Sequence, residues 1–116
     1  MFGNAKFAIV AAAASLCIAG QASAAIQDVD VMNNSGETIL AVYLSPEYRP
    51  DWGRDLLGNE ILEDGWMLEK RFNRDQGYCT YDVMVTFSDG SKMTKADVDL
   101  CTVSILEVVS NRIRAY

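Results

Sequence analysis

The sequence predicts an all-β protein, a small antiparallel two-layer β-sandwich of six to seven strands that carries one disulfide. From Ile26 onward apolar residues recur with a period of two, and no stretch shows the 3.6-residue period of an amphipathic helix. Turn-forming residues separate these runs about every 8 to 15 residues. Two half-apolar sheets must bury their faces against each other, so we expect two layers, with a small closed barrel as the alternative.

A leader precedes this domain. Residues 1–25 hold one charged residue, Lys6, and continue through an Ala-rich apolar run to the small residues Ala22-Ser23-Ala24. A basic start, an apolar run and an A-x-A processing site are the three parts of a secretory signal peptide. We therefore expect a signal peptide at residues 1–25 and a single secreted or periplasmic β-sandwich domain at residues 26–116.

The leader allows two other interpretations. The apolar run is long enough for a retained membrane anchor, but no stop-transfer charges follow it. A lipid anchor at Cys17 is the second, but Leu16 stands where a small residue is expected before an acylated cysteine. Cleavage after Ala24 or Ala25 is therefore favoured over both.

The first two strands are expected at residues 26–32 and 38–45. In the first, Val29 and Val31 alternate with aspartates, so one face can be dry and the other wet. The sequence Asn33-Asn34-Ser35-Gly36 between them favours a turn, because these residues tolerate positive φ. The second run is apolar on both faces, which predicts a central strand that is buried from both sides.

Residues 46–65 predict a long ordered connection, because prolines and glycines interrupt them while leucine and isoleucine supply surface to pack. A short strand is expected within it at residues 60–62. The next strand, at residues 66–72, places Lys70 on an otherwise apolar face. A lysine there is typical of an edge strand or a strand end, where its stem lies on apolar surface and its amine reaches water.

The last third contains the clearest hairpin. Residues 78–87 place a cysteine, a tyrosine and apolar residues on one face, and Ser88-Asp89-Gly90-Ser91 provides a tight turn. The return strand starts near Lys92, and a further strand rich in β-branched residues is expected at residues 103–109. The more polar residues 110–116 are expected to fray or to extend that last strand.

The cysteines predict one disulfide. Cys17 leaves with the leader, while Cys79 and Cys101 remain at neighbouring strand ends in an oxidising compartment. In the chain-entropy model this cross-link stabilises the fold by about 3 kcal/mol. A redox-active pair or half of a metal site is the alternative, but neither C-x-x-C spacing nor any histidine supports it.

Composition excludes several kinds of function. The 116 residues include no histidine, so we expect neither a Ser/His or Cys/His enzyme nor a metal site with imidazole ligands, and we expect no cofactor. Ten basic and 16 acidic residues give a net charge of −6, and removal of Lys6 with the leader makes it −7. The scattered acidic charge offers no basic patch for nucleic acid and is repelled by an anionic membrane surface.

Carboxylates are concentrated in the connection, which holds Glu47, Asp51, Asp55, Glu60, Glu63 and Asp64. Because Ca²⁺ requires oxygen ligands, a calcium site in loop 47–64 is one interpretation, with Asp51, Asp55 and Glu60 as candidate ligands. The spacing matches no EF-hand, which favours a solvated acidic loop instead. A carboxylate pair could serve a glycosidase, but so small a domain leaves little room for a cleft, and we expect no catalytic residue.

Trp52 and its neighbours are the candidate binding residues. An exposed tryptophan beside the carboxylates of Asp51 and Asp55 is typical of sugar stacking or protein docking, whereas a tryptophan that covers one end of the core is the structural alternative. Tyr48, Trp52 and Tyr78 form one aromatic patch only if the connection folds over the strand end at Tyr78.

Several short segments occur together in this chain: Asn33–Ile39, Tyr43–Pro46, Asp51–Gly58 with the sequence D-W-G-R-D-L-L-G, Cys79–Asp82 and Asp97–Cys101. In this combination the chain resembles an uncharacterised family of small secreted or periplasmic bacterial β-domains, over most of residues 26–108. The resemblance implies an exported β-domain with a disulfide. That family has no settled activity, so no catalytic residue is carried over. The chain departs from the pattern at Glu47-Tyr48-Arg49 and at residues 70–77, which puts a shared surface partner in doubt.

The sequence therefore predicts a non-catalytic module that binds a protein or a cell-envelope component, or that serves a structural role. Lys70 and the polar C-terminal run are expected to mark a docking edge for strand addition. The alternative is a small-ligand or calcium-binding protein that uses loop 47–64.

Overall fold

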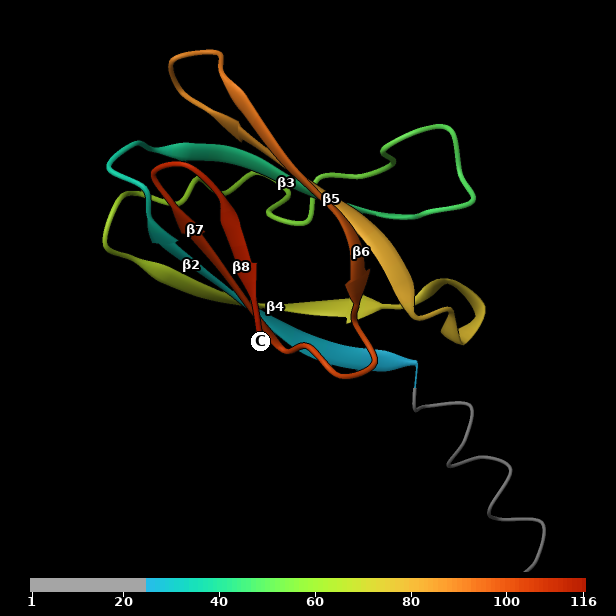
Figure 1. Ribbon diagram of the computed structural model, residues 1–116. Coiled ribbons are helices and arrows are strands. Elements are labelled where there is room, and N and C mark those ends of the chain that lie inside the picture. The colour runs from blue at the N-terminus through green and yellow to red at the C-terminus, as the bar shows by residue number, and fades with distance from the viewer. Residues whose placement is uncertain (1–24) are drawn as a thin grey trace, which may run out of the picture.

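The computed structural model describes residues 25–116, and Figure 1 shows their arrangement. The predicted signal peptide up to Ala24, with Cys17 inside it, lies outside the described residues. Across residues 25–116, no helix is long and apolar enough to cross a membrane.

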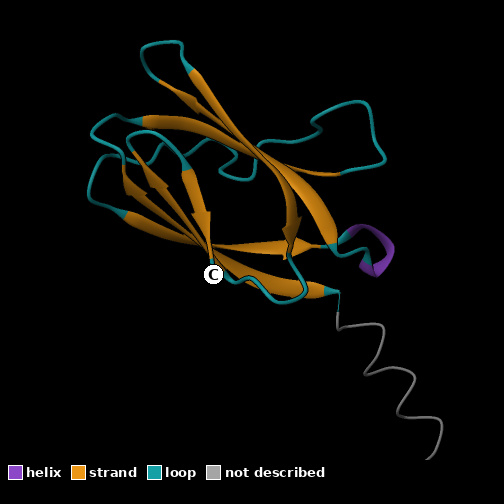
Figure 2. Ribbon diagram, viewed as in Figure 1, coloured by secondary structure: helices purple, strands orange, loops and turns teal. Residues whose placement is uncertain are grey.

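The described chain forms seven strands in two sheets, which confirms the predicted fold class. The four-stranded sheet has the order β4-β2-β7-β8 and consists of β2 (Ile26–Asn34), β4 (Met67–Asn73), β7 (Ile105–Val109) and β8 (Ile113–Ala115). The three-stranded sheet has the order β3-β5-β6 and consists of β3 (Ile39–Pro46), β5 (Thr80–Phe87) and β6 (Lys92–Asp99). In the described part of the chain the one helical element is a short 3-10 turn, η2 (Asp75–Gly77), which lies between β4 and β5 (Figure 2).

One pairing differs from the expected antiparallel pattern. β2 pairs with β7 in parallel, while β4 and β8 pair antiparallel with their neighbours, so the four-stranded sheet is mixed. A tight turn can join only antiparallel strands, and a parallel pair needs a long crossover. β7 meets that condition, because the chain builds the whole other sheet before it returns to β2.

The core lies between the inner faces of the two sheets. β2 contributes Val29 and Val31, and β5 contributes the alternating set Tyr81, Val83, Val85 and Phe87, as its period of two predicts. Each of these side chains is almost fully buried, and burying an aliphatic side chain stabilises the fold by about 1.5–3 kcal/mol.

The prediction that residues 38–45 form a central strand is wrong. β3 lies at the edge of its sheet, where β5 is the middle strand. The connection covers the outer edge of β3 instead: Ile39 and Leu62 exchange two backbone hydrogen bonds of 2.9 Å. Because Leu57 and Leu62 from this connection are buried against the core, β3 carries the apolar pattern of a central strand. The expected strand at residues 60–62 is reduced to this one bridge.

The other element predictions hold in outline. β4 is an edge strand, as Lys70 indicated, and β5 and β6 form the expected hairpin around residues 88–91. The polar C-terminal run extends the sheet as β8. Asn33 belongs to β2 rather than to the turn. Its buried side-chain amide donates hydrogen bonds to the backbone carbonyls of Glu37 and Leu62.

Candidate functional site

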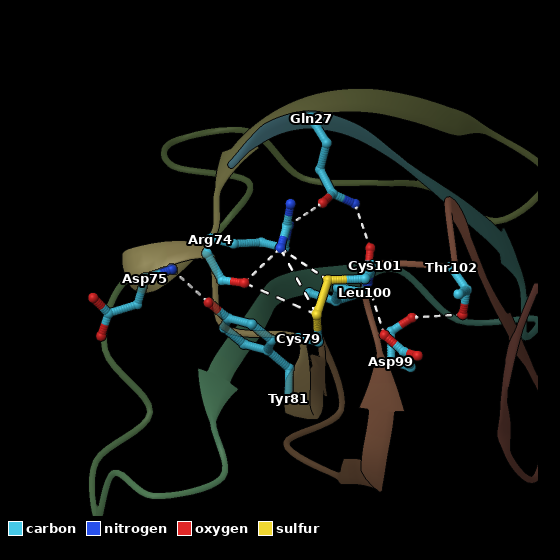
Figure 3. The surroundings of a disulfide bond; sticks show 10 residues. Gln27, Arg74, Asp75, Cys79, Tyr81, Asp99, Leu100, Cys101 and Thr102 are labelled. Atoms are coloured by element: carbon cyan, nitrogen blue, oxygen red, sulfur yellow. Dashed lines mark hydrogen bonds between the residues drawn. A yellow bond between two sulfur atoms is a disulfide. The ribbon is translucent and has the colours of Figure 1, made fainter. Parts of the chain in front are cut away.

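The predicted disulfide joins Cys79 and Cys101, with a Cα–Cα distance of 5.2 Å, at the open end of the β5–β6 hairpin. Figure 3 shows that the Arg74 side chain lies against it. The Arg74 Nη1 atom lies 2.9 Å from Cys101 Sγ and donates a 2.8 Å hydrogen bond to the Gly77 carbonyl. Arg74 Nε donates to Gln27, which in turn donates to the Leu100 carbonyl.

This arrangement makes the disulfide region a structural junction. Gln27 belongs to β2 and Leu100 follows β6, so the hydrogen bonds around Arg74 link the two sheets at one end of the sandwich. The sequence offered no signal for Arg74, because an arginine after a strand is ordinarily a solvated side chain. Within residues 25–116 the single group of three candidate metal ligands is Cys79, Asp99 and Cys101. Its two sulfurs are bonded to each other, so they are not thiolate ligands.

The candidate calcium ligands are engaged at separate places. Asp55 Oδ1 accepts hydrogen bonds from the backbone N–H groups of Val42 and Leu57, both 2.9 Å, so this carboxylate caps the outer edge of β3. Glu60 forms a 2.7 Å ion pair with Lys70. Asp51 accepts a 2.6 Å hydrogen bond from the Ser45 hydroxyl through its backbone carbonyl. In the described part of the chain, Asp51, Asp55 and Glu60 do not come together as one ligand set.

The connection does fold over the strand end at Tyr78. The Tyr48 and Tyr78 rings meet edge to face, with centroids 5.1 Å apart. The Tyr48 hydroxyl donates to Asp75, and Arg49 forms a 3.0 Å ion pair with the same carboxylate. Donation from Tyr48, followed by the charge of Arg49, lowers the pKa of Asp75 below its ordinary value, and the bond to Asp75 raises the pKa of Tyr48.

Trp52 is neither a fully exposed binding residue nor a fully buried cover of the core. Its side chain is half-buried and lines a cavity of about 180 Å³ with Phe72 and Tyr81. The predicted aromatic patch is therefore split in two. Tyr48 and Tyr78 contact each other over the strand end, and Trp52 lines a separate cavity beside β4.

Three cavities follow one another along the free edge of β4, the edge that faces away from β2, and together they form what we call the β4 groove. The first is the Trp52 cavity. The second, of about 380 Å³, shares Leu44, Arg54, Phe72 and Asn73 with it and adds Asp55, Leu56 and Arg71. The third, of about 300 Å³, is lined by Glu60, Ile61, Leu62, Glu63, Trp66 and Leu68. In each cavity one wall comes from β4 or a residue beside it and the other from the connection at residues 51–63.

The backbone of β4 is unpaired on this side. Asn33 donates to the Trp66 carbonyl and Arg74 donates to the Ala25 carbonyl, so even-numbered residues of β4 direct their backbone groups toward β2. In an antiparallel pair the alternate residues direct theirs the other way, which here means Met67, Glu69 and Arg71. Within residues 25–116 no hydrogen bond engages the backbone N–H or C=O groups of these three residues.

Comparison with known proteins adds no assignment to this geometry, because no family model, curated protein or solved structure matches the chain. The resemblance to small exported β-domains therefore stays a prediction. Among the residues that line the groove, the sequence indicated Asp51, Trp52, Asp55 and Glu60 as candidates but gave no indication of Arg54, Arg71 and Trp66. The position of Arg54 inside the D-W-G-R-D segment was the one available signal.

Proposed function

We propose that the protein is a non-catalytic binding module of the periplasm or the extracellular space, which takes up an extended segment of a partner protein as an added strand along β4. The observation that carries this proposal is the unpaired backbone of Met67, Glu69 and Arg71 beside the β4 groove. Strand addition uses both features, because main-chain hydrogen bonds supply affinity and side-chain pockets supply specificity.

The contrast with the outer edge of β3 supports this choice of edge. Backbone and carboxylate groups of the connection already pair with β3, so an incoming strand finds the outward backbone groups of Ile39 and Val42 engaged. β4 keeps its donors and acceptors, and its outer residues Glu69 and Arg71 are charged. Charged residues on an edge strand oppose indiscriminate pairing between copies, so a partner must be complementary to bind.

A non-catalytic role agrees with the chemistry of the described side chains. The chain has no histidine, and Cys79 and Cys101 are bonded to each other. The carboxylates of Asp55 and Asp75 accept hydrogen bonds that join parts of the fold, and the two do not face each other across one cleft as a catalytic pair would. The export part of the proposal is supported by the predicted leader and by the disulfide, which persists in oxidising compartments.

The test is a selection from displayed random peptides of about twelve residues, a length that exceeds the span of β4. The purified, disulfide-bonded protein is the target, and the selected peptides are then measured against variants. Glu69→Pro removes an outward N–H and places a ring at the edge, and proline is tolerated at edge strands. We expect it to weaken the selected peptides by roughly tenfold or more.

Two variants control for the charge and for proline itself. Glu69→Gln keeps the backbone N–H and should bind the peptides nearly as the parent does. Thr94→Pro places proline on β6 at a residue whose backbone N–H also points away from the sheet. Phe87 and Ser91 form a hydrogen-bonded pair, and hydrogen-bonded and non-hydrogen-bonded pairs alternate from there, so Thr94 falls in a non-hydrogen-bonded pair with Met84. Unchanged binding to Glu69→Pro with a native circular dichroism spectrum, or failure to select any peptide above background, would overturn the proposal.

A further inference from the structure

We infer that the strand accepted by β4 has two chemically different ends: an acidic side chain that reaches Arg54 and Arg71, and an apolar side chain beside a basic residue that reaches Ile61 and Trp66. This inference rests on the proposed function and specifies its partner.

The basic end of the groove is formed by the two arginines that line its largest cavity. Arg54 is exposed, and in the described part of the chain its guanidinium has neither a hydrogen bond nor an ion pair. Arg71 has a side chain 75% exposed and only a long 3.4 Å contact with Asp28. A guanidinium presents a planar set of donors that matches a carboxylate, so two of them on one cavity favour an acidic side chain.

The setting of these arginines strengthens the assignment. The chain as a whole carries a net charge of −6, so two arginines on one cavity are a local exception. Asp55 lines the same cavity, but its Oδ1 atom already accepts two backbone hydrogen bonds from β3 and the connection. The same cavity is lined by the apolar residues Leu44, Leu56 and Phe72, which offer contact to the methylene groups of an inserted acidic side chain.

The other end of the groove is apolar with an acidic rim. Ile61 is 54% exposed and Trp66 is 65% exposed, although both are large apolar residues, and together they line the cavity of about 300 Å³. Tryptophan beside a cavity is the residue type that most often anchors a protein interface. Glu60 and Glu63 stand at the rim, so a basic residue next to the inserted apolar side chain is complementary.

The spacing between the ends follows from β4 itself. Leu68 lines the apolar cavity and Phe72 lines the basic one, four residues farther along the same face of the strand. At about 3.3 Å per residue this is a separation of about 13 Å. The partner strand should therefore carry its apolar and acidic side chains at positions i and i+4. Lys70, paired with Glu60, lies between Leu68 and Phe72 on the same face of β4.

The same peptide selection tests this inference. On the parent protein, enriched peptides should share an acidic and an apolar residue four positions apart. On Arg54→Glu/Arg71→Glu the acidic position should become basic, and peptides selected on the parent should bind roughly tenfold or more weakly. The matched control is Lys92→Glu/Arg112→Glu, which changes the net charge equally at exposed residues that do not line the β4 groove.

The outcomes separate the two proposals. If Glu69→Pro abolishes binding but the Arg54→Glu/Arg71→Glu variant still selects acidic peptides, strand addition holds and the two-ended partner is wrong. If both double variants lose binding equally, net charge rather than the arginine pair decides the preference, and the inference again fails. If peptides bind Glu69→Pro normally, the strand-addition proposal fails, and the inference fails with it.

Discussion

The outer edges of β3 and β4 face the same connection, but only β3 is paired with it. Along β3 the connection supplies the backbone of Leu56 and Leu62 and the carboxylate of Asp55 as partners. Along β4 it supplies one side-chain ion pair, Lys70 with Glu60, and leaves cavities between. An irregular segment can thus close a sheet edge without forming a strand, and closing one edge can leave a groove along the other.

The largest expected effect breaks the closed edge. Leu62→Ala should lower the free energy of unfolding by about 3 kcal/mol, because it leaves a cavity under the residue that pairs with Ile39. Ile61→Ala, the adjacent residue on the open groove, should cost less than about 0.5 kcal/mol. Urea unfolding of the two variants measures the difference, and equal losses would contradict the distinction between the two edges.

The second effect concerns the carboxylate that caps β3. Asp55→Ala leaves the backbone N–H groups of Val42 and Leu57 without their acceptor and should cost about 2 kcal/mol. Asp51→Ala is the matched control, because the bond from Ser45 reaches its backbone carbonyl and survives the substitution. Addition of Ca²⁺ should leave the melting temperature of the parent protein unchanged. A calcium-dependent rise that Asp55→Ala abolishes would restore the calcium interpretation.

Hydrogen exchange distinguishes the two edges at the level of single amides. The N–H groups of Glu69 and Arg71 should exchange roughly tenfold or more faster than those of Ile39 and Val42, because only the latter pair is hydrogen-bonded to the connection. Addition of a selected peptide should slow the β4 amides and leave the β3 amides unchanged. Protection of Glu69 and Arg71 in the free protein would show that β4 already has a partner within the chain.

The smallest effect lies where the connection leaves β3. Because the pKa of Asp75 is lowered in the folded state, its bond to Tyr48 contributes stability above the ordinary aspartate pKa, and this is lost as the pH falls through the folded value. Because the pKa of Tyr48 is raised, its contribution is present below about 10 and is lost as the pH rises through the folded value.

Melting temperatures measured between acid and alkaline pH test this bond. Tyr48→Phe should flatten both the acid and the alkaline limb, whereas Tyr43→Phe, on β3, should leave both limbs as they are in the parent. An unchanged profile in Tyr48→Phe would mean that the bond to Asp75 does not link stability to pH.

Local features were predictable from the sequence, and distant pairings were not. The β5–β6 hairpin and the disulfide follow from one Asp-Gly turn and from two cysteines at its open end. Lys70 marked the edge strand because a lysine on an apolar face needs a route to water. The edge position of β3 escaped prediction because Leu57 and Leu62, from an irregular segment with no strand pattern, give it the burial of a central strand.

The groove was only partly predictable for the same reason. Trp52 and Asp55 were recognisable as candidates, but their separate roles depend on which strand each one meets. Arg54 and Arg71 come from opposite walls, and no spacing in the sequence indicates that they share a cavity.

The parallel pairing of β2 with β7 has a consequence for how the chain is completed. Among the described residues β2 is the first strand and β7 is the sixth, so the four-stranded sheet joins segments that lie far apart in the sequence. Contacts so distant in sequence form slowly, in milliseconds to seconds rather than microseconds. Until residues 105–109 arrive, β2 has a neighbour on one side only, and a chain cut short before that point would leave Val29 and Val31 beside an open strand edge. The newly made protein therefore depends on β7 and β8 to protect β2 from aggregation and proteolysis.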